Sequence, residues 1–364
     1  MIVRPNIFNI ATKELSHDSA ITWLMQWAHP DAESLDAEIH ACGSALLQVF
    51  LQGVNNDSKI TAVEARRQWH NIDIWVKVYF EDGEKYFFII ENKIFADEHS
   101  NQLVRYKEIA SEWAEKNGFK LGCFFVKIGS QPVNIMNGIS EKGYKIIDRN
   151  LILDNLNKVE NTKNSLIIDY KEFLKGIEDE HQAYNTLTID EWEGWQWVGF
   201  YQFVEKQIHV INWHFVNNPS GGFWNLLLNW EQWQDVPVYM QIEQGKLCYK
   251  IALGADQTGI DDAKTSLNQI QDFVHSKLLE YAHENGVSEI RRPHRHVHNG
   301  NYRTFAIIER EIWLGKDDDV IDKDKVVANL SRLLSFHNKF ISHLNMFSYE
   351  DAGLTVEYIV QETV

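Results

Sequence analysis

The chain has 364 residues, of which 44% are hydrophobic and 24% are charged, and its formal net charge is −17. This length and balance predict a globular protein with enough apolar side chains for two domains or one large one. The acidic balance excludes a protein that binds nucleic acid over its whole surface, because such a protein would be basic. An enzyme with a confined, cation-assisted site remains compatible with it.

The positions of the cysteines and the hydropathy of the chain indicate where in the cell the protein is located. The three cysteines, Cys42, Cys123 and Cys248, are scattered and fit neither a zinc nor a disulfide spacing. This suits a reducing environment, so we expect a cytoplasmic protein. We expect no membrane span, because no apolar run reaches 18 residues, and no signal peptide, because residues 1–15 lack an apolar core.

The first half of the chain alternates between helical and strand periodicity. Asp82-Gly83 is the strongest turn signal and predicts a hairpin. This order predicts an α/β (α+β) fold in which helices pack on a mixed central sheet. The elements expected are helices over 11–29 and 36–52, strands over 59–68, 71–80 and 86–93, a helix over 99–116, a strand over 121–128, and a short strand and helix over 144–156.

The composition shifts near residue 180, where we place a boundary between domains 1–180 and 181–364. Seven of the thirteen tryptophans lie between Trp192 and Trp233, and we interpret them as core or interface, with stacking on bases or sugars as the alternative. The second domain is predicted to be α+β. Its expected elements are a three-stranded meander over 223–254, a helix over 262–284, a strand over 305–314 and a closing helix over 322–345.

The apolar run over 87–90 leads directly into Glu91, Asn92 and Lys93. Buried strands do not normally end on charged side chains without a reason. Asp73 lies on the preceding strand of the predicted hairpin, so it should approach Glu91, and the period of two places Glu91 and Lys93 on one face. The alternative is a structural ion pair between Glu91 and Lys93.

Two adjacent carboxylates repel unless a cation lies between them, and hard oxygen ligands favour Mg²⁺ or Mn²⁺. Such an ion activates water and neutralises charge on a phosphoryl oxygen. The lysine would orient that water or stabilise the developing negative charge. The pattern therefore predicts hydrolysis of phosphodiester bonds.

Asp73 followed by Glu91-Asn92-Lys93 resembles the PD-(D/E)XK nuclease superfamily, whose core is restriction-endonuclease-like. "ATKELSHD" (11–18) and "NQLVRY" (101–106) resemble the superfamily's first helix and the helix after its sheet. The segment 91–106 is similar to an uncharacterised bacterial branch. The resemblance covers about residues 5–150, with Ile72 where the superfamily pattern has a proline.

The resemblance implies a role for each matching residue. Lys93 would be the catalytic lysine, and Gln102 would position the substrate phosphate or the lysine. The ligands of Mg²⁺, for which Mn²⁺ may substitute, would be Asp73, Glu91, the Asn92 carbonyl and Glu14, the last directly or through water. Glu14 has an alternative role, since an acid in a first helical turn complements the helix dipole. Asp18, one turn later, is its competitor.

The segment over 291–305 is the most basic part of the chain. Its arginines are candidates for phosphate contacts and its tyrosine for base stacking, and Tyr106 is a further candidate for nucleic-acid contact. The alternative is an exposed loop that pairs with acids elsewhere. The candidate nucleic-acid-binding residues in this segment are Arg291, Arg292, Arg295, Tyr302 and Arg303.

These features predict a Mg²⁺-dependent nuclease that acts on DNA in preference to RNA and serves bacterial defence against foreign DNA. We expect a homodimer, and a C-terminal domain that selects substrate, senses a protein or small-molecule activator, or mediates assembly. The alternative is a nuclease-like binding or regulatory module with weak or no catalysis that acts through a protein partner. The acidic composition favours this alternative, and the intact Glu91-x-Lys93 pattern argues against it.

Overall fold

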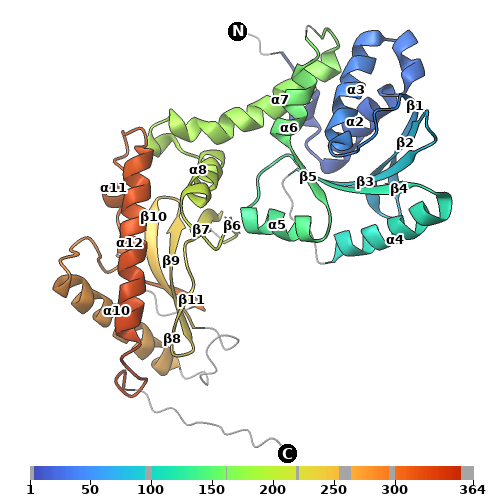
Figure 1. Cartoon of the computed structure of the whole chain (residues 1–364). Coiled ribbons are helices and arrows are strands. Elements are labelled where there is room, and N and C mark those ends of the chain that lie inside the picture. The colour runs from blue at the N-terminus through green and yellow to red at the C-terminus, as the bar shows by residue number, and fades with distance from the viewer. Residues whose placement is uncertain are drawn as a thin grey trace, which may run out of the picture. The chain divides into compact units, whose positions relative to one another are not determined.

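The computed structural model describes residues 4–94, 101–160, 162–218, 221–253, 264–294 and 300–353. The chain folds into two compact units, residues 1–180 and 181–364 (Figure 1). Each unit has its own sheet and its own hydrophobic core. Among the described residues, no helix combines the length and the apolar character needed to cross a membrane.

The first unit is built on a five-stranded mixed sheet with the order β1-β2-β3-β4-β5. The first three strands pair antiparallel, and the last three pair parallel. This sheet, with its flanking helices, confirms the predicted restriction-endonuclease-like fold class. The strands are β1 (Ile60–Trp69), β2 (Ile72–Phe80), β3 (Lys85–Lys93), β4 (Lys120–Lys127) and β5 (Lys145–Asp148).

Helices cover both faces of this sheet, which explains why β3 is apolar on both of its faces. Even-numbered residues of β3 and β4, such as Phe88 and Phe124, pack in the larger core with one group of helices. Odd-numbered residues, such as Phe87 and Phe125, face the other group. The first group is α2 (Glu14–Trp27), α3 (Ala37–Leu51), α6 (Arg149–Asn157) and α7 (Ser165–Gln182), with the short α1 (Ile7–Ile10), and the second is α4 (Gln102–Asn117) and α5 (Val133–Glu141).

Two tight turns join the antiparallel strands. Asp82-Gly83 closes the β2–β3 hairpin as predicted, with Gly83 at φ 86°. His70 and Asn71 join β1 to β2 with φ 52° and 66°. A two-residue hairpin loop with both residues at positive φ matches the right-handed twist of the strands. This second turn fixes where β2 begins, and therefore where Asp73 lies.

Some boundaries in the first unit differ from the prediction. The helix expected over 99–116 is described from Gln102 and ends at Asn117, where Gly118 adopts a left-handed φ of 66°. Such a glycine satisfies the last carbonyl groups of a helix. The sequence reading missed α5, whose nine residues lack a long periodic pattern.

The second unit is an antiparallel sheet with the order β11-β10-β9-β7-β6, and β8 pairs with β9. One continuous core joins this sheet to its helices. The strands are β6 (Asn212–Val216), β7 (Phe223–Leu227), β8 (Glu231–Trp233), β9 (Val236–Glu243), β10 (Lys246–Ala252) and β11 (Tyr302–Ile308), and the helices are α8 (Gly194–Gln207), α10 (Lys264–Glu284), α11 (Arg310–Trp313) and α12 (Lys323–Leu344).

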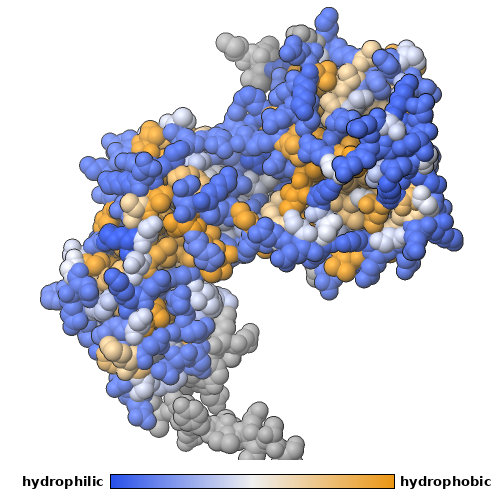
Figure 2. All heavy atoms as spheres, viewed as in Figure 1, coloured by the Kyte–Doolittle hydropathy of each residue, from blue (hydrophilic) through white to orange (hydrophobic). Residues whose placement is uncertain are grey.

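Two predictions for the second unit are wrong in detail. Residues 223–233 form two strands, β7 and β8, rather than one. The strand predicted over 305–314 ends at Ile308, and α11 follows it. The tryptophan-rich region contributes α8 as well as strands, and Trp197, Trp213 and Trp233 are buried in the core as interpreted. Hydrophilic residues cover most of the face in view in Figure 2.

Candidate active site

The β2–β3 hairpin brings the first two candidate residues together. Ile74 pairs with Ile90, so Asp73 lies opposite Glu91 at the end of the hairpin. The two carboxyl groups are close enough that the charge of Asp73 raises the pKa of Glu91. The Asn92 main-chain N–H donates to Asp73 Oδ2 at 3.0 Å, which anchors Asp73 to β3.

Lys93 lies among three carboxylates. Its Nζ is 2.7 Å from Glu91 Oε1, 3.8 Å from Glu14 Oε2 and 3.9 Å from Asp73 Oδ2. Glu14 is the first residue of α2, and its Oε1 accepts a hydrogen bond from the main-chain N–H of Ile94 at 3.2 Å. This bond joins the start of α2 to the end of β3. The structure thus gathers four residues that the sequence separates by up to 79 positions.

Burial makes this cluster electrostatically unusual. Glu91 is 1% exposed, and burial together with the charge of Asp73 raises its pKa to about 8. Burial also raises the pKa of Asp73, against the opposing effect of the Asn92 N–H. Burial alone would lower the pKa of Lys93, but its contact with Glu91 and the charges of Asp73 and Glu14 outweigh burial and raise that pKa. Strongly shifted acids of this kind gather at functional sites.

The oxygen atoms of this cluster fit a hard divalent cation. Glu91 Oε2 is buried and has no hydrogen-bond partner in the described part of the chain. A buried carboxylate oxygen without a partner is unfavourable, and a cation would satisfy it. Over the same described ranges, no three His, Cys, Asp or Glu side chains form a ready-made metal cluster. We attribute this to Lys93, whose ammonium lies among the carboxylates that would otherwise converge on an ion.

Gln102 and Tyr106 lie on α4, over the face of β3 that carries Glu91. Gln102 Nε2 donates to Glu91 Oε1 and to the Tyr106 hydroxyl, both at 2.9 Å. Tyr106 is only 3% exposed, so its ring is not available to stack on a base. The contact of Tyr106 with nucleic acid stays a prediction, and in this structure its hydroxyl accepts the hydrogen bond from Gln102.

The Asn92 side chain points to the opposite face of β3, into a polar group that the sequence reading largely missed. There it contacts His17 and Asp18 of α2. Burial lowers the pKa of His17 to about 4 and raises that of Asp18 to about 7, the latter with help from the charge of Asp73. The Tyr170 hydroxyl of α7 contacts His17 from the far side. The spacing of His17 and Asp18 from Glu14 on one predicted helix could have indicated these two residues from the sequence. No sequence pattern indicated Tyr170.

Lys127 is a second buried lysine at this edge of the sheet. It pairs in register with Lys93 on the parallel strand β4, and it is 1% exposed. Because it shares the odd-numbered face with Phe125, it lies on the side of the sheet that carries Glu91. A sequence signal existed, since "CFFVK" (123–127) is an apolar run that ends on lysine, as the run before Lys93 does.

The described arginines of the basic segment contact residues of their own unit. Arg303 is 5% exposed and donates to Asn268 and Gln271, so its contact with nucleic acid stays a prediction. Arg291 pairs with Glu309, and Arg292 lies 3.8 Å from Asp272. Tyr302 is exposed. Arg295 lies outside the described residues.

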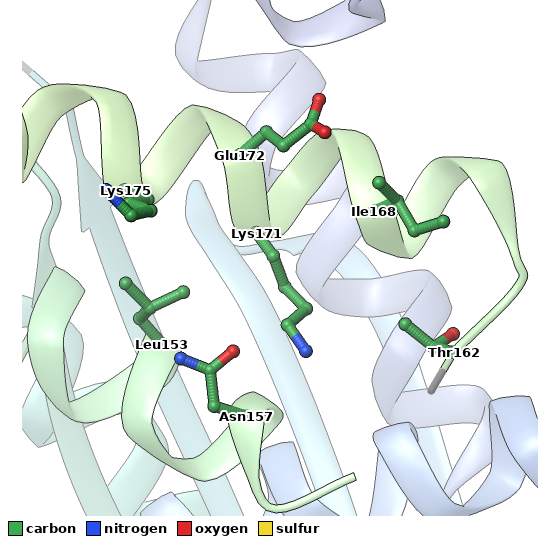
Figure 3. A pocket seen from close by; sticks show the side chains of 7 residues that line it. All are labelled: Leu153, Asn157, Thr162, Ile168, Lys171, Glu172 and Lys175. Carbon is green, nitrogen blue, oxygen red and sulfur yellow. The ribbon is translucent and has the colours of Figure 1, made fainter. Parts of the chain in front are cut away.

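A pocket of about 330 Å³ lies between α6 and α7 of the first unit (Figure 3). In the figure, the Lys171 side chain extends between Asn157 and Thr162. None of the residues that line this pocket belongs to the carboxylate cluster. The lining residues are Leu153, Asn157, Thr162, Ile168, Lys171, Glu172 and Lys175.

Residues 5–152 match the model of the PD-(D/E)XK nuclease superfamily. The matched range contains Glu14, Asp73, Glu91, Lys93 and Gln102. No curated protein and no solved structure matches the chain. The match supports a nuclease-like function for the first unit and nucleic acid as its substrate, and nucleases of this superfamily typically use divalent metal ions. The second unit lies outside the match.

Proposed function

We propose that the first unit is a metal-dependent nuclease that hydrolyses phosphodiester bonds, with DNA preferred over RNA. One observation carries this proposal. The Lys93 ammonium lies 2.7 to 3.9 Å from the carboxylates of Glu91, Glu14 and Asp73, inside the range that matches the model of a nuclease superfamily. A purely structural ion pair would need one carboxylate beside Lys93 rather than three.

The residues divide into those that would hold the metal and those that act on the substrate. Mg²⁺, or Mn²⁺ in its place, would be held by Asp73, Glu91, the Asn92 carbonyl and Glu14. When bound, the ion would activate a water and neutralise charge on the phosphate. Lys93 stays protonated because its pKa is raised. We therefore assign it the stabilisation of negative charge on the phosphoryl oxygens rather than removal of a proton.

Gln102 supports the same chemistry from α4. Its amide donates to Glu91 Oε1, the oxygen that also contacts Lys93. This bond fixes the orientation of the Glu91 carboxylate, so that Oε2 is the oxygen left for the metal. We propose that Gln102 is a positioning residue for Glu91.

In this proposal the second unit contributes no catalytic residue. We propose that it selects substrate, senses a protein or small-molecule activator, or mediates assembly into a homodimer. A role in the bacterial cytoplasm against foreign DNA fits the superfamily branch that the sequence resembles. The alternative function is a non-catalytic binding module. It is favoured by the net charge of −17 and by the absence of a ready-made metal cluster in the described ranges.

The deciding experiment compares wild type with Lys93→Ala and with Lys85→Ala, which removes a lysine from the opposite end of β3. Plasmid, linear duplex, single-stranded DNA and RNA are incubated with Mg²⁺, Mn²⁺ or EDTA. We expect metal-dependent cutting of DNA that falls at least about 100-fold in Lys93→Ala and is unchanged in Lys85→Ala. Cutting by Lys93→Ala at the wild-type rate would reject the assigned site. A folded wild type that neither cuts nor binds Mn²⁺ would favour the binding module.

A further inference from the structure

A chain of buried hydrogen bonds joins α7 to the catalytic strand β3. The Tyr170 hydroxyl lies 2.6 Å from His17 Nε2, and His17 Nδ1 lies 2.9 Å from Asn92 Oδ1. Asn92 Nδ2 then donates to Asp18 Oδ1 at 2.8 Å. All four side chains are buried. A polar group that is buried and fully paired both rigidifies and specifies its surroundings.

The chemistry of the groups fixes the direction of each bond. Asn92 uses its amide N–H on Asp18, so the oxygen that faces His17 can only accept. The hydrogen between them therefore belongs to His17 Nδ1. A histidine buried this deeply is neutral, so its Nε2 has a lone pair that accepts from the Tyr170 hydroxyl. The chain runs from Tyr170 as the first donor to Asp18 as the last acceptor.

The chain passes through Asn92, the residue that shapes the proposed metal site. Asn92 lies between Glu91 and Lys93, its N–H holds Asp73, and its carbonyl is a proposed metal ligand. Because its side-chain bonds to His17 and Asp18 tether Asn92 to α2, they also help to hold its main-chain N–H and carbonyl in place. Tyr170 is itself held in place, because its ring packs on Phe8 with centroids 5.1 Å apart. The neighbouring Asp169 receives hydrogen bonds from Arg4 and from the main-chain N–H of Ile7.

We propose that His17 and Tyr170 are positioning residues of the nuclease site, which fix the orientation of Asn92 and thereby of the Asp73–Glu91–Lys93 cluster. This inference rests on the proposed function and deepens it. Residues that orient metal ligands in this way typically change metal affinity or activity by about 10-fold to 100-fold when they are altered. A role confined to stability would leave metal affinity unchanged in a variant that is still folded.

The first test uses Tyr170→Phe in the full-length chain, which removes the hydroxyl and keeps the ring. The matched control is Tyr86→Phe, which removes the hydroxyl of another buried tyrosine at the opposite end of β3, where it donates to Glu84. Mn²⁺ is titrated calorimetrically into each protein at a temperature below both unfolding transitions. We expect Tyr170→Phe to bind Mn²⁺ at least about 10-fold more weakly than wild type, with a matching loss in kcat, and Tyr86→Phe to bind as wild type does. Wild-type affinity and kcat in Tyr170→Phe would overturn the inference.

The second test needs no mutant activity. Nitrogen NMR of ¹⁵N-histidine-labelled protein distinguishes the protonated from the unprotonated ring nitrogen of His17, whose signals are identified by their loss in His17→Gln. We expect a neutral ring protonated at Nδ1. Protonation at Nε2, or at both nitrogens near neutral pH, would overturn the inference. A wild type that binds no Mn²⁺ would count against the proposed function, whereas a wild type that binds Mn²⁺ as tightly as Tyr170→Phe would count against the positioning role alone.

Discussion

Glu91 shows how much a single residue depends on its surroundings. On the sequence it is one of 52 acidic residues, but the fold buries it beside Asp73 and leaves Lys93 as its main cationic partner. Replacing buried charges by neutral groups is often stabilising, so a buried acid tends to cost stability. Its presence here therefore indicates a functional role. In the proposed function that role is to bind a cation.

Glu91 should also set the pH dependence of stability in the metal-free protein. Its folded-state pKa of about 8 lies above the ordinary value of 4.5, so the folded state retains this proton longer than the unfolded state. The contribution of this group is therefore fully present below about pH 4.5 and is lost as pH rises toward 8. With EDTA present, we expect Glu91→Gln to gain stability relative to wild type between pH 5.5 and pH 8, by at most ~1.4 kcal/mol per pH unit.

Urea unfolding at several pH values measures this difference, with Glu64→Gln as the control. Glu64 lies on β1, where its carboxylate contacts Lys77 and Tyr79 rather than the cluster. Parallel pH curves for wild type and Glu91→Gln would show that the burial of Glu91 has no energetic consequence. Glu91→Gln should at the same time abolish cleavage, since it removes a proposed metal ligand.

At the scale of elements, hydrophobic periodicity predicted the strands that form the site. β2 alternates between buried and partly exposed residues, as its sequence indicates, and β3 is the buried strand expected from its apolar run. The turn at Asp82-Gly83 then sufficed to place Asp73 near Glu91. Elements without a long pattern were misread, such as the strand expected over 305–314, where α11 follows β11.

The turn at His70-Asn71 contributes to the stability of the first unit, and substitutions of Asn71 test this contribution. Asn71 has φ 66°, a conformation that asparagine and glycine tolerate better than alanine. We expect Asn71→Ala to lower the free energy of unfolding by about 1 kcal/mol and Asn71→Gly to leave it nearly unchanged. Urea unfolding of the three proteins measures this. Equal losses in both variants would point to a role for the Asn71 side chain instead of its backbone conformation.

At the scale of the whole molecule, two units with separate cores carry separate pH-sensitive groups. His337 of α12 is buried in the second unit, where burial lowers its pKa to about 3. Because the unfolded state binds this proton below the ordinary pKa of 6.5 and the folded state does not, stability falls as pH drops from 6.5 toward 3.

Replacement of His337 by methionine should therefore flatten the acid side of the stability curve. Between pH 6 and pH 4, we expect wild type to lose up to ~1.4 kcal/mol per pH unit more than His337→Met. Tryptophan fluorescence during urea unfolding reports mainly on the second unit, which holds eight of the thirteen tryptophans, including Trp213 and Trp233 in its core. The same slope in both proteins would show that His337 does not titrate with unfolding.

The amino-acid sequence was enough to predict the strand hairpin, the acids and lysine at its end, and the class of fold, because these depend on local periodicity, on turn chemistry and on pairing between neighbouring strands. The packing of the folded chain was needed to identify the distant groups that join them. Glu14 reaches Lys93, and Tyr170 reaches His17, through the packing of α2 and α7 on the sheet. It also decided that Tyr106 and Arg303 are buried, since exposure depends on what packs over a side chain, and no local pattern records that.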